Sequence, residues 1–285
     1  MMQIDLSGKR VLITGGTRGI GRAIALTLAQ AGAQIGAIYR SNVEAATRTA
    51  TDLQTAPSLQ GEHFALQADI ADEAQATSAV QEALARFGGA LDVLVLDAAA
   101  GAGGPLVGMS TSDWKRPFEV NVHGAFYVLR AAAPALQRGG SVVFLSSGAG
   151  HDPMEGLSAY GSSKAAVNHL STVLAQELGP QGVRVNTVSP GHTYTGDDNP
   201  NTHPELWNPS QKQIAETTAL RRLGIAQDVA NVVLFFASDL SGFVTGQWYE
   251  SMADVFDNFD NNERPQRTGP LRAERQSFSA PALLG

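Results

Sequence analysis

The chain alternates between two kinds of segment. Short runs rich in β-branched and aromatic residues are separated by longer Ala- and Leu-rich stretches, such as 21–32 and 72–88, whose apolar residues recur at helical spacing. Several of the short runs are apolar on both faces, which is typical of a parallel sheet covered by helices on each side. This alternation predicts an α/β fold with one doubly wound parallel sheet of about seven strands flanked by helices. The predicted strands lie at 10–14, 34–39, 63–67, 93–96, 141–146, 183–188 and 247–250.

A sheet of this kind brings the carboxyl ends of its strands to one edge, where ligands bind. Two segments interrupt the alternation. Residues 191–218 are rich in Pro, Asn, Asp and Thr and follow a strand end, so we expect a lid over that edge. Residues 255–285 have no helical or strand period, so we expect an extended C-terminal tail, either disordered or lying over a neighbouring subunit. The remaining sequence predicts a single domain over residues 1–254.

Composition excludes several classes of function. The 285 residues carry a formal net charge of -7, and such a surface repels a phosphate backbone, so nucleic acid is not an expected partner. The absence of cysteine excludes disulfides and thiolate nucleophiles, and the six histidines show no metal-binding spacing, so we expect no metal. The first residues lack the apolar core of a signal peptide, and no uncharged apolar run could span a bilayer. We therefore expect a cytoplasmic protein without membrane contact.

Three glycines stand between the first predicted strand and the first predicted helix, in the stretch VLITGGTRGIGRAIA. They are Gly15, Gly19 and Gly21. Glycine permits a tight turn and lets the backbone approach a pyrophosphate, and the following helix N-terminus offers free N–H groups and a partial positive charge. Because the strand, the turn and the helix agree, the loop predicts a dinucleotide-binding site.

The spacing of this loop, Gly-x-x-x-Gly-x-Gly, resembles the cofactor loop of the short-chain dehydrogenase/reductase family. The resemblance runs from about Leu6 to Gly246, through several motifs in the expected order. It implies a Rossmann-type sheet, a nicotinamide dinucleotide and a catalytic site built on a tyrosine and a lysine.

The charge at the end of the second strand predicts which nicotinamide cofactor is bound. An acidic residue there would bind the ribose 2′-hydroxyl of NAD. This chain instead has Arg40, in the stretch YRSN, and Arg18 within the glycine loop. Two guanidinium groups can pair with a 2′-phosphate through charge-assisted hydrogen bonds, so we predict NADP(H). The alternative is that both arginines are solvated surface charges.

Tyr160 and Lys164, in the stretch SAYGSSKAAV, are four residues apart and so share one face of a helix. A free phenol has a pKa near ~10, which is poor for proton transfer at neutral pH. An ammonium group ~4 Å away, at an effective dielectric of ~20, would be worth roughly 4 kcal/mol. We therefore expect Lys164 to lower the pKa of Tyr160 towards neutrality. Because Tyr-x-x-x-Lys occurs by chance in many helices, the pair needs support from other residues.

That support comes from Ser147, which follows the fifth strand, and from Asn121, in the stretch EVNVHGAF; both match the positions that the family uses. The resemblance implies that Tyr160 exchanges a proton with the substrate oxygen while Ser147 hydrogen-bonds the same oxygen. It implies that Lys164 holds the nicotinamide ribose and lowers the pKa of Tyr160. Asn121 would support a water linked to Lys164.

The resemblance also implies contacts along the rest of the cofactor. Asp69 matches the residue that binds the adenine amino group, although it could instead cap the helix beginning near residue 72. Pro190 and Gly191 end the sixth strand, Thr193 should approach the carboxamide, and Thr195 should lie near the phosphates. The predicted cofactor residues are Gly15, Thr17, Arg18, Gly19, Ile20, Gly21, Arg40, Ser41, Asn42, Asp69, Ile70, Ala98, Ala99, Tyr160, Lys164, Pro190, Gly191, Thr193 and Thr195.

Two stretches depart from the family pattern. After the fourth strand the family usually has Asn-Asn-Ala-Gly, whereas this chain has LDAAAG, in which Asp97 brings an anion near the cofactor. Asp97 could cap a backbone turn or pair with a neighbour. Near the end, ESMAD (250–254) replaces Val-Asp-Gly-Gly in a stretch that often forms a subunit contact. The family resemblance still implies a homo-oligomer, either a dimer or a tetramer.

The substrate pocket is less clearly encoded. Its candidate residues mix apolar and polar side chains, which favours a fairly apolar aromatic, polycyclic or polyketide-like ketone. Two of them have alternatives, because His192 could be a solvated loop residue and Trp207 could pack the lid onto the body. The candidates are Gly148, Ala149, His151, Met154, His192, Tyr194 and Trp207.

The leading functional hypothesis is an NADPH-dependent carbonyl reductase that can run in reverse as an alcohol dehydrogenase. A second hypothesis keeps the fold but reduces a 3-ketone attached to an acyl carrier; the acidic surface disfavours it, because carrier proteins are acidic themselves. A third is a non-catalytic NADP-binding scaffold or sensor. The complete Ser, Tyr, Lys and Asn set argues against the third, since a binding module needs no proton relay.

Overall fold

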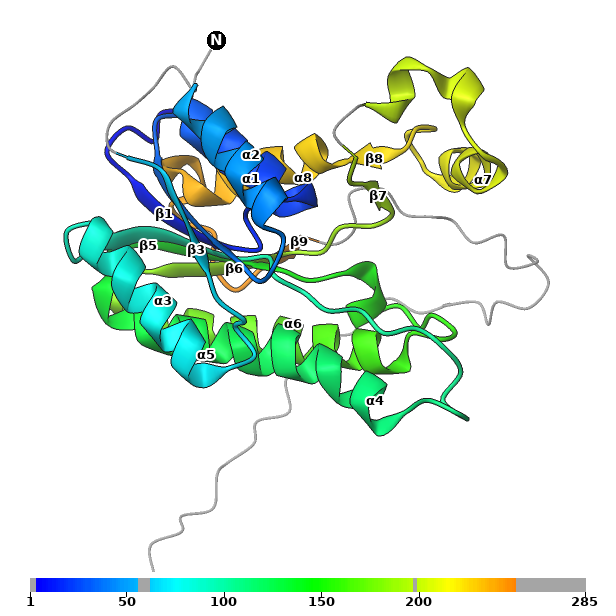
Figure 1. Cartoon of the computed structure of the whole chain (residues 1–285), viewed down its shortest axis with the longest axis horizontal. Coiled ribbons are helices and arrows are strands. Elements are labelled where there is room, and N and C mark those ends of the chain that lie inside the picture. The colour runs from blue at the N-terminus through cyan, green and yellow to red at the C-terminus, as the bar shows by residue number, and fades with distance from the viewer. Residues whose placement is uncertain (1–3, 56–61, 197–198, 250–285) are drawn as a thin grey trace, which may run out of the picture.

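The computed structural model describes residues 4–55, 62–196 and 199–249. At its centre lies a seven-stranded sheet with the strand order β3-β2-β1-β4-β5-β6-β9, in which neighbouring strands are parallel (Figure 1). The predicted α/β class and the doubly wound parallel sheet are confirmed. The strands are β1 Arg10–Thr14, β2 Gln34–Tyr39, β3 Phe64–Gln67, β4 Leu91–Leu96, β5 Leu136–Leu145, β6 Arg184–Val188 and β9 Trp248–Tyr249.

Helices cover both faces of this sheet (Figure 1). One face carries α1 Gly19–Gln30, α2 Val43–Gln54 and α8 Ala226–Ala237. The other carries α3 Glu73–Arg86, α4 Thr111–Pro117, the π-helix η1 Phe118–Gly124, α5 Ala125–Ala132 and α6 Ser158–Leu178. Short 3₁₀ helices are η2 Ala133–Ala135, η3 Gly148–Gly150, η4 Gly179–Gln181, η5 Pro200–Thr202, η6 Pro204–Leu206 and η7 Asp239–Ser241.

The two helical layers explain why the strands are apolar on both faces. Along β1, Val11 and Ile13 join the core that includes Ile24 and Val233, from α1 and α8. Leu12, between them, joins the opposite core with residues of α3, α5 and α6. Because successive side chains of a strand point to opposite faces, both sets must be apolar for the sheet to be buried on both sides.

The strand β5 is longer than the sequence pattern predicts. It begins at Leu136, which pairs with Leu91, and the register shifts before the regular pairing of Val93 with Ser141. Residues 137–139 of this extension are exposed, and Gly139 has a φ of +85°. An exposed, glycine-containing segment has no apolar alternation, so the pattern could not reveal it.

The strand order reverses between β1 and β4, which places the loops after these two strands on either side of a crevice. Helix α1 begins at this crevice without a side-chain cap, since its N-cap residue Arg18 makes no capping hydrogen bond. By contrast, the neighbouring helices α2 and α3 are capped by Asn42 and Asp72. The N-terminus of α1 therefore keeps N–H groups for an anion.

The predicted lid region, residues 191–218, contains more structure than the sequence pattern indicates. β7 Thr193–Tyr194 pairs with β8 Gly224–Ile225 in a separate two-stranded sheet. Helix α7 Pro209–Thr217 begins with a capping box formed by Asn208 and Gln211, and it projects beyond the end of the central sheet (Figure 1). Whether this region closes over the site stays a prediction. The predicted tail, residues 255–285, and the ESMAD stretch lie outside the described residues.

Candidate active site

The glycine loop is built around two left-handed residues. Gly15 and Gly19 have φ angles of +74° and +53°, which L-amino acids with side chains rarely adopt. At Gly21, a Cβ atom would lie 2.3 Å from the Gly15 carbonyl oxygen and 2.6 Å from Asp97 Oδ2. The three glycines therefore hold the turn and the start of α1 in a form that other residues could not adopt.

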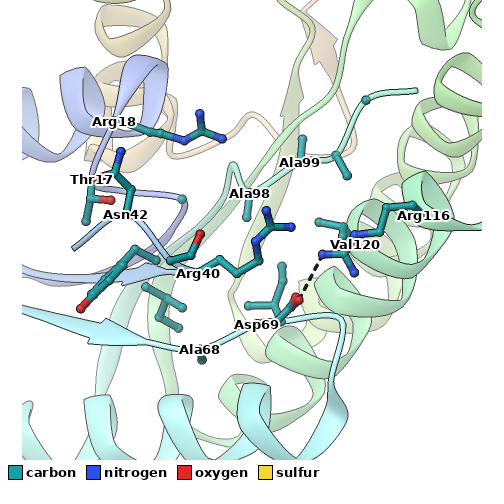
Figure 2. Close-up of a pocket in the computed structure, with 17 residues that line it drawn as sticks. Thr17, Arg18, Arg40, Asn42, Ala68, Asp69, Ala98, Ala99, Arg116 and Val120 are labelled. Atoms are coloured by element: carbon teal, nitrogen blue, oxygen red, sulfur yellow. Dashed lines mark hydrogen bonds and ion pairs between the residues drawn. The ribbon is translucent and has the colours of Figure 1, made fainter. Parts of the chain in front are cut away.

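This loop forms one wall of a cavity of about 580 Å³ (Figure 2). Its other walls come from the ends of β2, β3 and β4 and from the helix that carries Arg116 and Val120. Ten of the predicted cofactor residues line it: Gly15, Thr17, Arg18, Arg40, Ser41, Asn42, Asp69, Ile70, Ala98 and Ala99. An elongated anionic ligand fits this lining, because it combines backbone glycines, hydroxyl groups and guanidinium groups.

Arg18 and Arg40 both line this cavity, although they come from different loops (Figure 2). Arg18 belongs to the glycine loop and Arg40 directly follows β2. Both side chains are exposed, so the choice between phosphate binding and two solvated surface charges stays a prediction. The two arginines lie where a phosphate on the adenosine ribose could be held between them.

A third arginine, Arg116, lies across the cavity and was not among the sequence predictions. Its guanidinium donates to Asp69 Oδ2 at 3.1 Å, and Asp69 Oδ1 accepts from the Ala71 N–H at 3.0 Å (Figure 2). Burial tends to raise the pKa of Asp69, but these two hydrogen bonds and the charges of Arg116 and Arg40 hold that pKa below its ordinary value. Asp69 is not the helix cap, since Asp72 caps α3 through the Gln75 N–H. The only sequence signal for Arg116 is its position five residues before Asn121.

The structure brings Ser147, Tyr160 and Lys164 together at the carboxyl end of β5. Ser147 follows β5 and begins η3, whereas Tyr160 and Lys164 lie in the first two turns of α6. Ser147 lies close enough to Tyr160 to act against the rise in the pKa of the phenol. The hydroxyl groups of the predicted serine and tyrosine thus lie next to each other, and two groups that bind one substrate oxygen must do so.

The prediction that Lys164 lowers the pKa of Tyr160 is wrong in this structure. Lys164 is buried and its Nζ donates to the Leu145 carbonyl oxygen at 2.7 Å, 5.8 Å from the centre of the Tyr160 ring. Burial and the negative charge of Asp97 raise the pKa of Tyr160, while Ser147 opposes them. Two residues on one helix face need not place their side-chain ends together when one side chain is long and flexible. Here the Lys164 ammonium group donates to the Leu145 carbonyl and not to the Tyr160 phenol.

Asn121 is buried in η1 and all its side-chain atoms are used within the protein. Its Oδ1 accepts from the Ala100 N–H at 2.8 Å, and its Nδ2 donates to the Ala100 carbonyl at 3.0 Å and to Ser163 Oγ at 2.9 Å. The side chain thus ties the segment after β4 to α6. A water linked to Lys164, as the resemblance implies, would therefore have to be held by the main chain of Asn121.

Asp97 belongs to the LDAAAG stretch that departs from the family pattern. It lies between the glycine loop and the pair Tyr160 and Lys164. The Gly21 N–H, in the first turn of α1, holds the pKa of this carboxyl down, and whether Asp97 caps a turn or pairs with a neighbour stays a prediction. Burial raises its pKa to about 7, against the opposing charges of Lys164 and Arg18. Burial likewise lowers the pKa of Lys164 to about 8, and the charge of Asp97 opposes that shift.

The remaining residues predicted to contact the cofactor or the substrate lie outside the cavity formed by the glycine loop. Thr195 lies close to Gly19, since a Cβ atom there would be 3.4 Å from the threonine Cβ, and this brings the segment after β6 to the phosphate loop. His192 and Thr193 line a small separate crevice with Arg222 and Asp228. Ile20, Gly21, Lys164, Tyr160, Pro190 and Gly191 are not part of the cavity lining that the structure shows.

The candidate substrate residues are only partly brought together. Ala149, His151 and Met154 line a second cavity of about 680 Å³ between the β5–α6 segment and residues 104–106. Gly148 lies beside Met154, whose Cε would be 3.8 Å from a Cβ at that glycine. Trp207 instead lies in the α7 region, where its Nε1 donates to the Pro200 carbonyl at 2.8 Å. Its contacts lie within the lid region, so the alternative that Trp207 packs the lid onto the body stays a prediction.

Comparison with known proteins decides the family. A family model described as enoyl-(acyl carrier protein) reductase matches residues 15–250. The chain is 34% identical over 247 residues to the 7alpha-hydroxysteroid dehydrogenase of Escherichia coli, covering 86% of this chain and 92% of that protein. The chain belongs to the short-chain dehydrogenase/reductase family. The predicted resemblance is confirmed.

Two further relatives of this family bear on the chemistry. A 3-oxoacyl-(acyl-carrier-protein) reductase of Staphylococcus aureus is 34% identical over 242 residues, covering 84% of this chain and 94% of that protein. A short-chain dehydrogenase from Burkholderia cenocepacia, solved in complex with NADP, superposes with a TM-score of 0.76 at 34% identity, covering 86% of this chain and 96% of the other. The named relatives are dehydrogenases and reductases, and this short-chain dehydrogenase/reductase is an oxidoreductase acting on CH–OH or C=O groups.

Within 4–55, 62–196 and 199–249 no three His, Asp or Glu side chains group in a way that could hold a metal ion. In the same ranges no helix is both long and apolar enough to cross a membrane.

Proposed function

We propose that this short-chain dehydrogenase/reductase is an NADPH-dependent carbonyl reductase that also runs in reverse as an alcohol dehydrogenase. The observation that carries the proposal is that Ser147, directly after β5, lies beside Tyr160 and a buried Lys164 in the first two turns of α6. A hydroxyl and a phenol that meet at one point can bind and protonate a single carbonyl oxygen.

In reduction, the Tyr160 phenol donates its proton to the substrate oxygen, and the Ser147 hydroxyl donates a second hydrogen bond to that oxygen. The raised pKa of Tyr160 keeps the phenol protonated through neutral pH, which suits a proton donor. Lys164 would hold the nicotinamide ribose, and the nicotinamide, when bound, supplies the hydride. In the reverse direction Tyr160 accepts the proton of the alcohol.

Tyr160→Phe tests this role. The variant should lose turnover of any ketone by at least about a hundredfold, because it lacks the proton donor, while its NADPH affinity stays within about threefold of wild type. Tyr127→Phe, on α5 and outside the cavity lining, is the matched control and should leave both quantities unchanged. A Tyr160→Phe enzyme that still reduces ketones at the wild-type rate would refute the proposal.

The proposed preference for NADP(H) rests on Arg18 and Arg40, which line the same cavity. A charge reversal at Arg40 tests it. Arg40→Asp should weaken NADPH binding and strengthen NADH binding, because a carboxylate repels the 2′-phosphate and can accept a hydrogen bond from a 2′-hydroxyl. Arg86→Asp, on the far end of α3, is the control for a general change in charge. Isothermal titration with both cofactors measures the ratio, and an unchanged ratio in Arg40→Asp would contradict the assignment.

For the substrate we propose an apolar, polycyclic or aromatic ketone or secondary alcohol. The cavity that Ala149, His151 and Met154 line also contains Leu106 and Leu157, together with Asp152 and Glu155. One relative is named for a hydroxysteroid, which is a polycyclic alcohol. A panel of NADPH-dependent reductions, from polycyclic ketones to small keto acids, tests the class; a preference for small charged keto acids would contradict it.

A second candidate is the reduction of a 3-oxoacyl group on a carrier protein, which is favoured by the named activity of one relative. Comparing one 3-oxoacyl chain as a free thioester and as a carrier conjugate separates the two functions. A gain in kcat/KM that depends on the carrier would favour the second candidate.

We also propose that the protein is a cytoplasmic homo-oligomer. Support comes from the sheet edge, where Trp248 and Tyr249 of β9 and the nearby Phe243 are exposed. A short apolar edge strand of this kind is a surface that proteins usually cover. Sedimentation equilibrium measures the assembly, and a monomer at micromolar concentration would refute this part.

A further inference from the structure

Asp97 is an ionisable group that the proposed reaction does not use. It follows β4, and its carboxyl lies against the glycine loop: Oδ2 would be 2.6 Å from a Cβ on Gly21 and 3.1 Å from one on Gly15. The same carboxyl accepts a hydrogen bond from the Gly21 N–H. Asp97 therefore occupies the inner side of the turn to which the dinucleotide phosphates would bind.

Charged and titratable groups face Asp97 from two elements. Arg18 contributes a positive charge from the glycine loop and Lys164 contributes one from α6. Tyr160, also on α6, responds to the charge of Asp97. The strands contribute no charge here: Thr14 of β1 accepts from the Ala98 N–H through its hydroxyl. Asp97 thus stands between the phosphate loop and the catalytic pair.

We propose that Asp97 must be protonated for a dinucleotide to bind the glycine loop, so that binding of the cofactor takes up a proton at this carboxyl. The inference rests on the proposed function, since it assumes a dinucleotide on the glycine loop. A carboxylate anion beside Gly15 and Gly21 repels the incoming phosphates and competes with them for the positive end of α1. A neutral carboxyl keeps an acceptor oxygen for the Gly21 N–H and removes the repulsion.

The pKa of Asp97, raised by burial to about 7, places this event in the physiological range. Above that pH the free protein must acquire a proton before or during binding, so affinity falls by up to about tenfold per pH unit while one proton is linked. The negative charge of the ligand sets the direction of this pH dependence. A bound anion raises the pKa of Asp97 further, so cofactor affinity is highest at low pH and falls as pH rises.

Lys164 titrates in the same range and is coupled to Asp97, so the test removes it first. Lys164→Met is compared with Lys164→Met/Asp97→Asn, which keeps the shape of the carboxyl. Because loss of the Lys164 charge raises the pKa of Asp97 further, NADPH binding is measured by titration calorimetry from pH ~8 to ~10. Two buffers of different ionisation enthalpy at each pH give the number of protons taken up. A phosphate with its second pKa near ~6 is fully ionised there, and NADH serves as a check on that group.

Proton uptake with Lys164→Met, up to one per NADPH, and none with the double variant is the expected result. Equal uptake by the two variants overturns the inference but leaves the proposed function standing. Failure of the wild-type protein to bind either cofactor overturns both.

Asp97→Asn alone provides a second measurement that leaves the lysine in place. Near pH ~8 it should bind NADPH up to about tenfold more tightly than wild type, because only about a tenth of wild-type molecules then carry the proton. Wild type binding as tightly as this variant at that pH would also overturn the inference. Thermal unfolding of each variant checks that the comparison is made between folded proteins.

Discussion

Comparing two buried asparagines measures how much the side-chain hydrogen bonds of Asn121, beside the cofactor cavity, contribute to the free energy of unfolding. Asn121 makes three side-chain hydrogen bonds, two to Ala100 and one to Ser163, and is 3% exposed. Asn168, on α6, is 1% exposed, and neither of its side-chain polar atoms has a partner among the described residues. Replacing each by Leu removes an amide of similar size and adds a similar apolar group. The difference between the two variants therefore isolates the hydrogen bonds.

Three hydrogen bonds at ~1 kcal/mol each predict that Asn121→Leu is less stable than Asn168→Leu by about 3 kcal/mol. At roughly 2–4 °C per kcal/mol, melting temperatures should differ by about 6–12 °C. Asn168→Leu should stay within ~1 kcal/mol of wild type, because no partner is left unsatisfied. Urea denaturation followed by fluorescence measures the free energies. Equal destabilisation of the two variants would show that the Asn121 hydrogen bonds contribute nothing net.

Three further outcomes are expected. Gly21→Ala should destabilise the fold by ~1–3 kcal/mol and weaken NADPH binding, because its Cβ would lie 2.3 Å from the Gly15 carbonyl oxygen; wild-type affinity in a titration would contradict this. Phe144→Ala, at a position 1% exposed in the core, should cost ~3–5 kcal/mol in urea denaturation, and a loss below ~1 kcal/mol would speak against this packing. Alcohol oxidation should accelerate as pH rises, because the raised pKa of Tyr160 leaves little phenolate at neutral pH; a rate that does not change between pH ~6 and ~9 would contradict this.

The central sheet could be predicted because its signal is repeated in each strand. Val11, Leu12 and Ile13 are apolar in succession, and only a strand with helices on both sides needs that pattern. β7 and β8 could not be predicted in the same way. Each has two residues, and Thr193 pairs with Gly224 only because the fold brings these distant segments together. Such short strands depend on tertiary contacts that local sequence does not encode.

The candidate site divides along a similar line. The positions of Ser147, Tyr160 and Lys164 followed from motif spacing, because the spacing fixes which strand end and which helix turn carries each residue. The direction of the Lys164 ammonium did not follow, since its four-carbon chain can reach several acceptors and the nearest is the Leu145 carbonyl. Burial of the Tyr160 phenol was likewise not visible in the sequence, and it decides the direction of the pKa shift.

Net charge and local charge lead to opposite expectations for an anionic cofactor. The formal net charge of -7 implies that the surface as a whole repels a dinucleotide phosphate. The cavity nevertheless gathers Arg18, Arg40 and Arg116 against a single carboxylate, Asp69, which is itself held by Arg116. Because charges that line a cavity act over a few ångströms, while salt screens distant surface charges, we expect the local excess of guanidinium groups to outweigh the net charge. We therefore expect the net charge to slow the association of protein and cofactor, and the charges that line the cavity to raise the affinity of the complex.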